Sequence, residues 1–340
     1  MADRTVSAGY TKALIDVSVS RGADQDVLAA RVGLDLETLD NPDTRVPFSV
    51  FKSLMLASKA VCNDPAFGLH FGETSHFEDM SIVGLICHAA GTMGEAFEQM
   101  NRFARLAIEV DGHDTSNRFD LIRVGQDLWL EDQRRNPNDF PELTESTFAR
   151  FICDTKRHFG DAPFARAVHF THSAPSYRAE YDRVLSVPLV FNSDKNAILI
   201  HDSWLSIPIN HENKYVFGIF SERAEALLKS LENAATTKGD VETRIIPILH
   251  TGALNMDQIA KAMGLSRTTL YRRLKEEGVN FDALVDALRH KMALHYLDGK
   301  KVSVNETAYL VGFSDPTAFS RAFKRWTGKS PAKREVGTSA

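Results

Sequence analysis

Cysteine is scarce in this sequence, and its spacing builds no framework. Only three cysteines occur among 340 residues, Cys62, Cys87 and Cys153. No two of them form a C-x-x-C pair. This spacing argues against both a disulfide scaffold and a cysteine zinc site. We therefore expect reduced, buried thiols.

Long hydrophobic runs are also missing. The most apolar stretch, from Ser81 to Ala90, is interrupted by His88, and it is too short for a bilayer span, which takes about 20 apolar residues. Residues 1–20 lack the basic start and the apolar core of a signal peptide. We expect a cytoplasmic protein without a membrane segment.

Motifs of catalysis are absent as well. Neither G-x-S-x-G nor G-x-G-x-x-G occurs, and Gly328-Lys329-Ser330 lacks the earlier glycine that a phosphate-binding loop needs. His70-x-x-Glu73-x-x-His76 has a spacing that suggests metal ligands, but it lacks the H-E-x-x-H order of zinc proteases, and polar loop or surface residues are the favoured interpretation. We expect no catalytic residue, no metal site and no cofactor.

What the sequence does contain is an internal repeat. Residues 256–275 read MDQIAKAMGLSRTTLYRRLK, and residues 304–324 read VNETAYLVGFSDPTAFSRAFK. At an offset of 48, Ala260, Gly264 and Ser266 align with Ala308, Gly312 and Ser314. Each copy has a short apolar-periodic segment, a glycine for the turn, a serine able to cap the next helix, and a second helix with an apolar stripe. The repeat predicts two helix-turn-helix units.

The second helix of each copy presents side chains that suit DNA. With the apolar positions buried, a period of 3.6 residues leaves one face of each helix outward. The predicted base-reading residues are Thr268, Tyr271, Arg272, Thr317, Ser320 and Arg321. The predicted phosphate contacts are Arg267, Arg273, Lys275, Lys324 and Arg325.

This region resembles the DNA-binding domain of the AraC/XylS family of transcription regulators. The resemblance is carried by residues 311–316, 319–326 and 327–331 and covers roughly the last hundred residues. It implies an all-α domain in which a long helix, from about Phe281 to Leu297, joins the two units. It also implies promoter DNA and RNA polymerase as partners, and activation of transcription. One departure is Thr307, which aligns with Ile259, where an aliphatic residue is usual.

Charge is distributed unevenly along the chain. The net charge is −5, yet residues 240–340 hold 16 Lys/Arg against 11 Asp/Glu, a balance of +5. The remaining 24 Lys/Arg and 34 Asp/Glu give residues 1–239 a balance of −10. The basic end is therefore the part expected to meet phosphate.

Residues 1–229 alternate between helical and strand patterns, which predicts an α+β domain. Helices are predicted within 9–69 and over 94–106, 141–159 and 176–185; strands are predicted over 106–110, 119–124, 128–131, 166–172 and 196–201. Asp111-Gly112 and residues 125–127 are predicted turns.

Residues 10–210 also resemble the N-terminal ligand-binding domain of the AraC-type branch that includes ornithine-utilisation regulators. The matching segments are 64–69, 91–96 and 188–191, with His172, Pro175 and Tyr181 between them. This resemblance implies a small-molecule effector and self-association. The residues alone single out His88, Trp129 and Tyr181 as weak candidates for a pocket wall.

Residues 230–239 have the polar composition of a linker between this effector domain and the DNA-binding domain, 240–340. Before it, a predicted helix over 214–233 carries an apolar stripe at alternating spacings of three and four: Phe217, Phe220, Ala224, Leu227 and Leu231. Such a stripe is typical of a seam in a homodimer. It is equally consistent with packing on the chain's own effector domain.

Together these patterns predict a ligand-responsive transcription regulator. Two other classes stay open at this point. One is a metabolising enzyme domain fused to a DNA-tethering module, which would turn over its ligand. The other is an architectural DNA-binding protein, whose affinity would be indifferent to sequence.

Overall fold

A computed structural model describes residues 4–110, 117–209, 214–234, 236–252, 254–298 and 302–331. The chain divides into two compact units, residues 1–228 and 229–340. Within the described ranges, no helix is long and apolar enough to cross a membrane.

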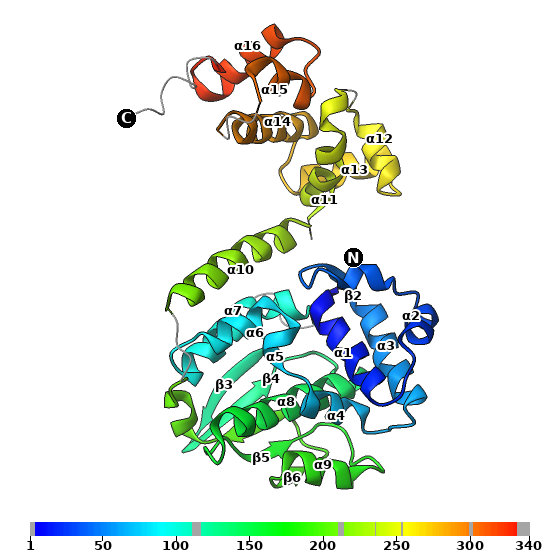
Figure 1. Ribbon diagram of the computed structural model, residues 1–340, viewed down its shortest axis with the longest axis vertical. Coiled ribbons are helices and arrows are strands. Elements are labelled where there is room, and N and C mark those ends of the chain that lie inside the picture. The colour runs from blue at the N-terminus through cyan, green and yellow to red at the C-terminus, as the bar shows by residue number, and fades with distance from the viewer. Residues whose placement is uncertain are drawn as a thin grey trace. The chain divides into compact units, whose positions relative to one another are not determined.

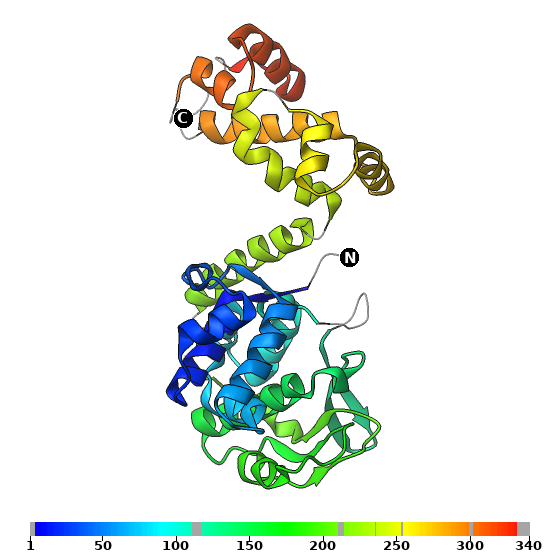
Figure 2. The same ribbon diagram turned by 90° about the vertical axis from the view of Figure 1, so that its right-hand side faces the viewer.

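The first unit combines a mixed sheet with helices (Figures 1 and 2). Its elements, with 3-10 helices marked η, are β1 (Thr5–Ser7), α1 (Ala8–Ser20), α2 (Gln25–Val32), η1 (Leu36–Leu39), β2 (Arg45–Pro47), α3 (Phe48–Val61), α4 (Phe67–Thr74), α5 (Phe77–Met80), α6 (Ile82–His88), α7 (Met93–Ala107), β3 (Phe119–Val124), β4 (Asp127–Asp132), η2 (Pro137–Asp139), α8 (Pro141–Phe159), β5 (Ala165–His169), α9 (Arg178–Leu185), β6 (Leu189–Val190), β7 (Ala197–Ile200), η3 (Asp202–Ser206) and the first part of α10 (Lys214–Ala234).

The main sheet has the strand order β3-β4-β7-β5-β6. Only β5 and β6 run parallel to each other; the other neighbours are antiparallel. A separate antiparallel pair, β1 and β2, joins two segments about forty residues apart in sequence. The predicted α+β class is confirmed.

Helix α8 is the central helix of this unit, and all its residues from Glu142 to Arg150 are buried. Helix α4 packs closely on it, because Gly72 leaves room for the approach. A Cβ at Gly72 would lie 2.2 Å from the backbone oxygen of Ser146. The predicted helix over 141–159 coincides with α8.

One predicted strand of this unit is wrong. Residues 106–110 were expected to be extended, but α7 continues to Ala107. Its buried residues Met100, Phe103 and Ala107 recur at helical spacing, which favours continuing the helix. Only Ile108 pairs as a strand does, in an isolated bridge with Val6. The predicted turn at Asp111-Gly112 lies outside the described residues.

The second unit is all helical. After the end of α10, its elements are α11 (Thr237–Ile245), η4 (Ile246–Thr251), α12 (Met256–Ala262), α13 (Arg267–Glu276), α14 (Phe281–Asp298), α15 (Val304–Leu310) and α16 (Pro316–Thr327). The predicted joining helix is therefore present as α14, and the predicted all-α fold of this unit is confirmed.

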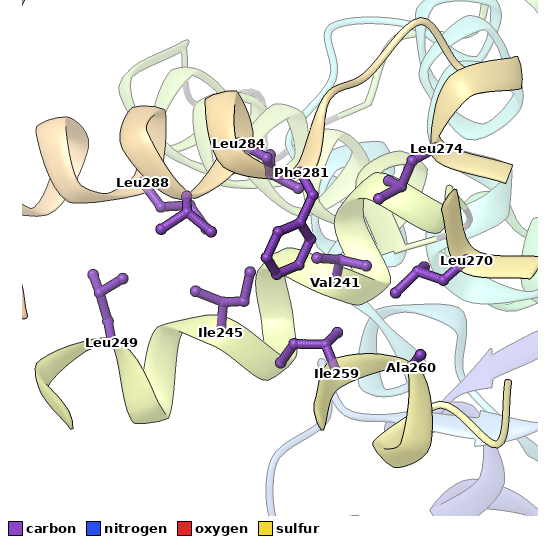
Figure 3. Close-up of a cluster of buried hydrophobic side chains, with 11 residues drawn as sticks. Val241, Ile245, Leu249, Ile259, Ala260, Leu270, Leu274, Phe281, Leu284 and Leu288 are labelled. Carbon is purple, nitrogen blue, oxygen red and sulfur yellow. The ribbon is translucent and has the colours of Figure 1, made fainter. Parts of the chain in front are cut away.

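Two apolar cores lie along α14. Figure 3 shows the first, in which Leu284 and Leu288 of α14 face side chains of α11, η4, α12 and α13. The second core contains Ala293 and Leu297 of α14 together with residues of α15 and α16. Met292 packs against both cores. Both helix-turn-helix units are thus built on one helix.

The predicted linker, 230–239, contains helix on both sides of residue 235. Helix α10 continues to Ala234, and α11 begins at Thr237. The side chain of Thr236 caps α11 by accepting a hydrogen bond from the Gly239 amide at 3.0 Å. Threonine followed by polar residues suits a helix start as well as a loop, so composition alone did not separate the two.

Candidate functional sites

The first helix-turn-helix unit consists of α12 and α13. Its turn bends at Gly264, whose φ of +66° lies in the left-handed region that glycine favours. Ser266 caps α13, as predicted, by accepting a hydrogen bond from the Thr269 amide at 3.1 Å. Ala260, at the crossing of the two helices, is fully buried. The turn residues singled out in the sequence therefore have the expected roles.

The second helix-turn-helix unit consists of α15 and α16. Its turn packs closely against η4, whereas the turn of the first helix-turn-helix unit is open. Gly312 has a φ of +82°, and a Cβ there would lie 2.1 Å from the backbone oxygen of Leu249. The expectation that Ser314 caps α16 is wrong. Asp315 is the cap, and it accepts hydrogen bonds from the amides of Thr317 and Ala318, because the extra residue in this copy moves the helix start by one position.

Thr307, the departure from the family pattern, is accommodated without an unpaired hydroxyl. Its side chain is fully buried, and its Oγ1 donates a hydrogen bond of 2.9 Å to the backbone oxygen of Ser303. Ser303 itself begins α15 with a capping box shared with Glu306. The threonine therefore packs in the place of the expected aliphatic residue.

The six predicted base-reading residues lie on the outer faces of α13 and α16. On α13, Thr268 is exposed, Tyr271 is 54% exposed and the side chain of Arg272 is 71% exposed. On α16, Thr317 and Arg321 are exposed, whereas Ser320 is half-buried. α13 therefore offers the more open surface of the two helices.

The predicted phosphate contacts fall into two groups. Arg267 forms an ion pair of 3.1 Å with Asp257, and Arg325 forms one of 2.7 Å with Asp286. The other three, Arg273, Lys275 and Lys324, are exposed, and in the described part of the chain no carboxylate lies within ion-pair distance of them. These three cations are the ones left unneutralised for an anionic partner.

Asp286, on α14, has a role that the sequence did not indicate. Its carboxylate accepts hydrogen bonds from Nη2 of Arg325 and, at 2.9 Å, from Nε1 of Trp326. These contacts fasten the end of α16 to α14. No local pattern reveals them, because the partners are about forty positions apart.

The predicted dimer seam lies on α10, which matches the predicted helix closely. Ala224 is fully buried within the single chain, and Phe217 packs against a cluster of Ala90, Ala96 and Ile209. Phe220, Leu227 and Leu231 are half-buried. Part of the stripe therefore packs on the first unit of its own chain, as in the second interpretation of the pattern.

His70 of the metal-like pattern is buried in helix α4, not in a loop or on the surface as favoured from the sequence, and both of its ring nitrogens contact carboxylates. Its Nδ1 lies 2.6 Å from Asp64 and its Nε2 lies 2.9 Å from Glu180. Glu73 is paired instead with Arg183, whose hydrogen bonds lower the pKa of Glu73. These contacts tie α4 to α9.

A cavity of about 160 Å³ lies in the first unit, bordered by α5, α6, α7, α8, β4 and η3. Of the three pocket candidates, His88 lines it. Trp129 lies elsewhere, with its ring under Lys195 and beside His169. Tyr181 is buried and donates a hydrogen bond to Glu145. Sequence reasoning missed Arg150, Asp154 and His158, although their spacing of four along the predicted helix placed them on one face.

Comparison with known proteins finds family matches in both parts of the chain. The family model for the arabinose-binding domain of AraC transcription regulators, N-terminal, matches residues 22–209, and a helix-turn-helix domain model matches residues 259–334. The chain belongs to the AraC family of transcription regulators. It is thus a ligand-binding, DNA-binding transcription regulator, and its relatives give no support to the enzyme alternative.

Relatives of this AraC-family chain match it over different lengths. The ornithine utilization regulator of Pseudomonas aeruginosa is 26% identical, over 96% of this chain and 95% of its own. The HTH-type transcriptional activator RhaS of Escherichia coli O139:H28 is 34% identical over 32% of this chain and 39% of its own. Among solved structures, CdpR of Pseudomonas aeruginosa covers 92% of this chain and 96% of its own with 19% identity and a TM-score of 0.40.

Proposed function

We propose that this AraC-family regulator activates transcription by placing α13 and α16 in successive major grooves of one promoter face. The observation that carries this proposal is the packing of both recognition helices on a single helix, α14. A shared support keeps their separation constant, as reading two grooves about 34 Å apart requires. The six base-reading residues named above would contact base edges, and the basic residues beside them would contact phosphates.

The wider assignment covers the domains, the location and the partners of the protein. Residues 1–229 sense a small molecule, residues 240–340 bind DNA and residues 230–239 form the junction. The protein works in the cytoplasm as a homodimer through α10, and it contacts RNA polymerase. Activation is supported by the relative RhaS, which is a transcriptional activator. Dimerisation is supported by the apolar stripe of α10.

A footprint of the full chain on DNA recovered from cells tests the groove assignment. We expect two protected, non-identical half-sites per protomer in direct orientation, because α13 offers Tyr271 where α16 offers Ser320. Protection of one groove per protomer would refute the proposal. The footprint of Arg321→Ala serves as the internal comparison, since it should weaken protection of one half-site only.

A further inference from the structure

The two helix-turn-helix units touch each other outside α14. Gly252 ends η4, which precedes the first helix-turn-helix unit, and Gly312 forms the turn of the second. A Cβ at Gly252 would lie 3.0 Å from the backbone oxygen of Gly312, and a Cβ at Gly312 would lie 3.3 Å from the Cα of Gly252. Both residues have positive φ, +70° and +82°. Two backbones therefore approach each other here as closely as glycine permits.

Leu249 connects this contact to the first apolar core of the second unit. Its side chain is buried in that core (Figure 3). Its backbone oxygen accepts a hydrogen bond of 3.4 Å from the amide of Gly252. The same oxygen is the atom that a Cβ at Gly312 would meet at 2.1 Å. The turn of the second helix-turn-helix unit therefore rests on the backbone of η4, and the first core holds η4 in place.

Arg289 of α14 contacts the same turn. Its Nη2 donates a hydrogen bond of 3.4 Å to the backbone oxygen of Gly312. Its guanidinium lies over the ring of Phe313, 5.0 Å from the ring centroid, and Phe313 packs against the second core. Both α14 and η4 therefore hold the peptide that carries the Gly312 oxygen.

A contact outside α14 restricts a motion that α14 alone would permit. Both cores are built along this one helix, and helices packed on a common partner can slide and roll by small amounts. Rolling of the second core about α14 would carry α16 away from its place relative to α13. The contact between Gly252 and Gly312 lies beside the axis of α14 and opposes such rolling.

We propose that Gly252, Gly312 and Arg289 are positioning residues that make the protein selective for the spacing between its two DNA half-sites. The inference rests on the proposed binding of α13 and α16 in successive grooves. One inserted base pair turns the second half-site by about 35° and moves it by about 3.4 Å. Two recognition helices that cannot roll relative to each other cannot follow this displacement. None of the three residues is among the base-reading or phosphate residues, so spacing is selected separately from base sequence.

Binding of the full chain to a set of duplexes tests the proposal. The starting duplex is the site that the full chain selects from a pool of random sequences, and footprinting locates its two half-sites. In the derived duplexes one base pair is inserted or removed between the half-sites, and affinity is measured by fluorescence anisotropy. The parent chain should lose affinity at least about tenfold on either change, because base contacts in one half-site are lost. This factor is the spacing loss.

Two variants loosen the contact, and a third is the matched control. Gly252→Ala places a Cβ against the Gly312 oxygen, and Arg289→Met removes the hydrogen bond to that oxygen. Both should reduce the spacing loss by about threefold or more, because residues in contact are energetically coupled. Gly278 also has a positive φ, +69°, but a Cβ there would meet no atom of the described residues within 4 Å. Gly278→Ala should therefore keep the spacing loss of the parent. Affinity for a duplex with only one half-site should stay within about twofold of the parent in all three.

An unchanged spacing loss in either contact variant that folds, as judged by circular dichroism, would overturn the proposal. An equal reduction in Gly278→Ala would overturn it too, because backbone strain would then be the cause. Arg289→Met decides alone if Gly252→Ala does not fold. A parent chain that protects one groove and shows no spacing loss would instead contradict the proposed binding in two grooves. The two failures are thus distinguishable.

Discussion

Gly264 and Gly312 occupy equivalent turns of the two helix-turn-helix units, yet we expect their replacement by alanine to have unequal effects. Both have positive φ, +66° and +82°, and a left-handed conformation costs a residue with a Cβ about 1–2 kcal/mol. The lower entropy of the unfolded alanine chain returns about 0.4–1 kcal/mol. Conformation alone therefore predicts a net loss of about 1 kcal/mol at either position.

The surroundings of the two turns differ. A Cβ at Gly264 would meet no atom within 4 Å, whereas one at Gly312 would lie 2.1 Å from the Leu249 oxygen and 3.3 Å from the Gly252 Cα. Because these are backbone atoms, the turn or η4 has to move. Overpacking of this kind typically costs about 1–3 kcal/mol more. Gly312→Ala should therefore destabilise the second helix-turn-helix unit by about 2–4 kcal/mol.

Urea unfolding followed through Trp326 measures this difference. Trp326 packs in the second core near Phe313, and replacing the other two tryptophans by phenylalanine in the full chain leaves it as the only indole. The free energies of unfolding of Gly264→Ala and Gly312→Ala are compared using the same m-value, the slope of the free energy against urea concentration. Losses that agree within about 0.5 kcal/mol would refute the argument from the Leu249 contact.

Three further outcomes are expected from the described contacts. Arg272→Ala should lower the affinity for the specific site by about 1–3 kcal/mol and leave the affinity for random DNA nearly unchanged. Lys275→Ala should weaken binding to specific and random DNA alike and reduce the slope of log affinity against log salt concentration by about one. Anisotropy titrations of both variants test these outcomes. Burial raises the pKa of Glu145, so the folded state retains a proton that the unfolded state releases. The free energy of unfolding should therefore fall as pH rises above the pKa of Glu145 in the unfolded chain. Glu145→Gln should flatten this fall in melting experiments across pH. Leu227→Glu should give a folded monomer by light scattering and circular dichroism. Ala224→Glu, at a fully buried position, should instead unfold residues 1–228. A folded dimer from Leu227→Glu would exclude the seam.

The sequence was most informative where a pattern is local. The repeat located both turns and the outward faces of α13 and α16, because helix periodicity and glycine at a turn depend on neighbouring residues only. Ser314 was mistaken for a cap, since aligning the copies did not resolve where the inserted residue lies. Residues 106–110 were mistaken for a strand, since β-forming side chains do not override a buried helical stripe.

The features that the sequence did not reveal depend on contacts between distant segments. Asp286 reaches α16 across about forty positions, and Trp204 and Arg150 line one cavity although they are far apart in the sequence. His70 illustrates the same limit in reverse. Its spacing to Glu73 suggested a shared ion, but the fold directs His70 to Asp64 and Glu180 and directs Glu73 to Arg183.

Because both cores are built on α14, its length fixes which operators the protein can read. Each residue inserted into a helix lengthens it by about 1.5 Å and rotates the rest of the helix by about 100°. A single insertion between Leu288 and Ala293 would therefore swing α16 away from the duplex. Seven residues, close to two full turns, would restore its phase about the helix axis but move it about 10.5 Å along that axis, away from the spacing of about 34 Å at which major grooves recur on one face of the duplex. Homologues that read two grooves on one face should therefore keep the length of this helix.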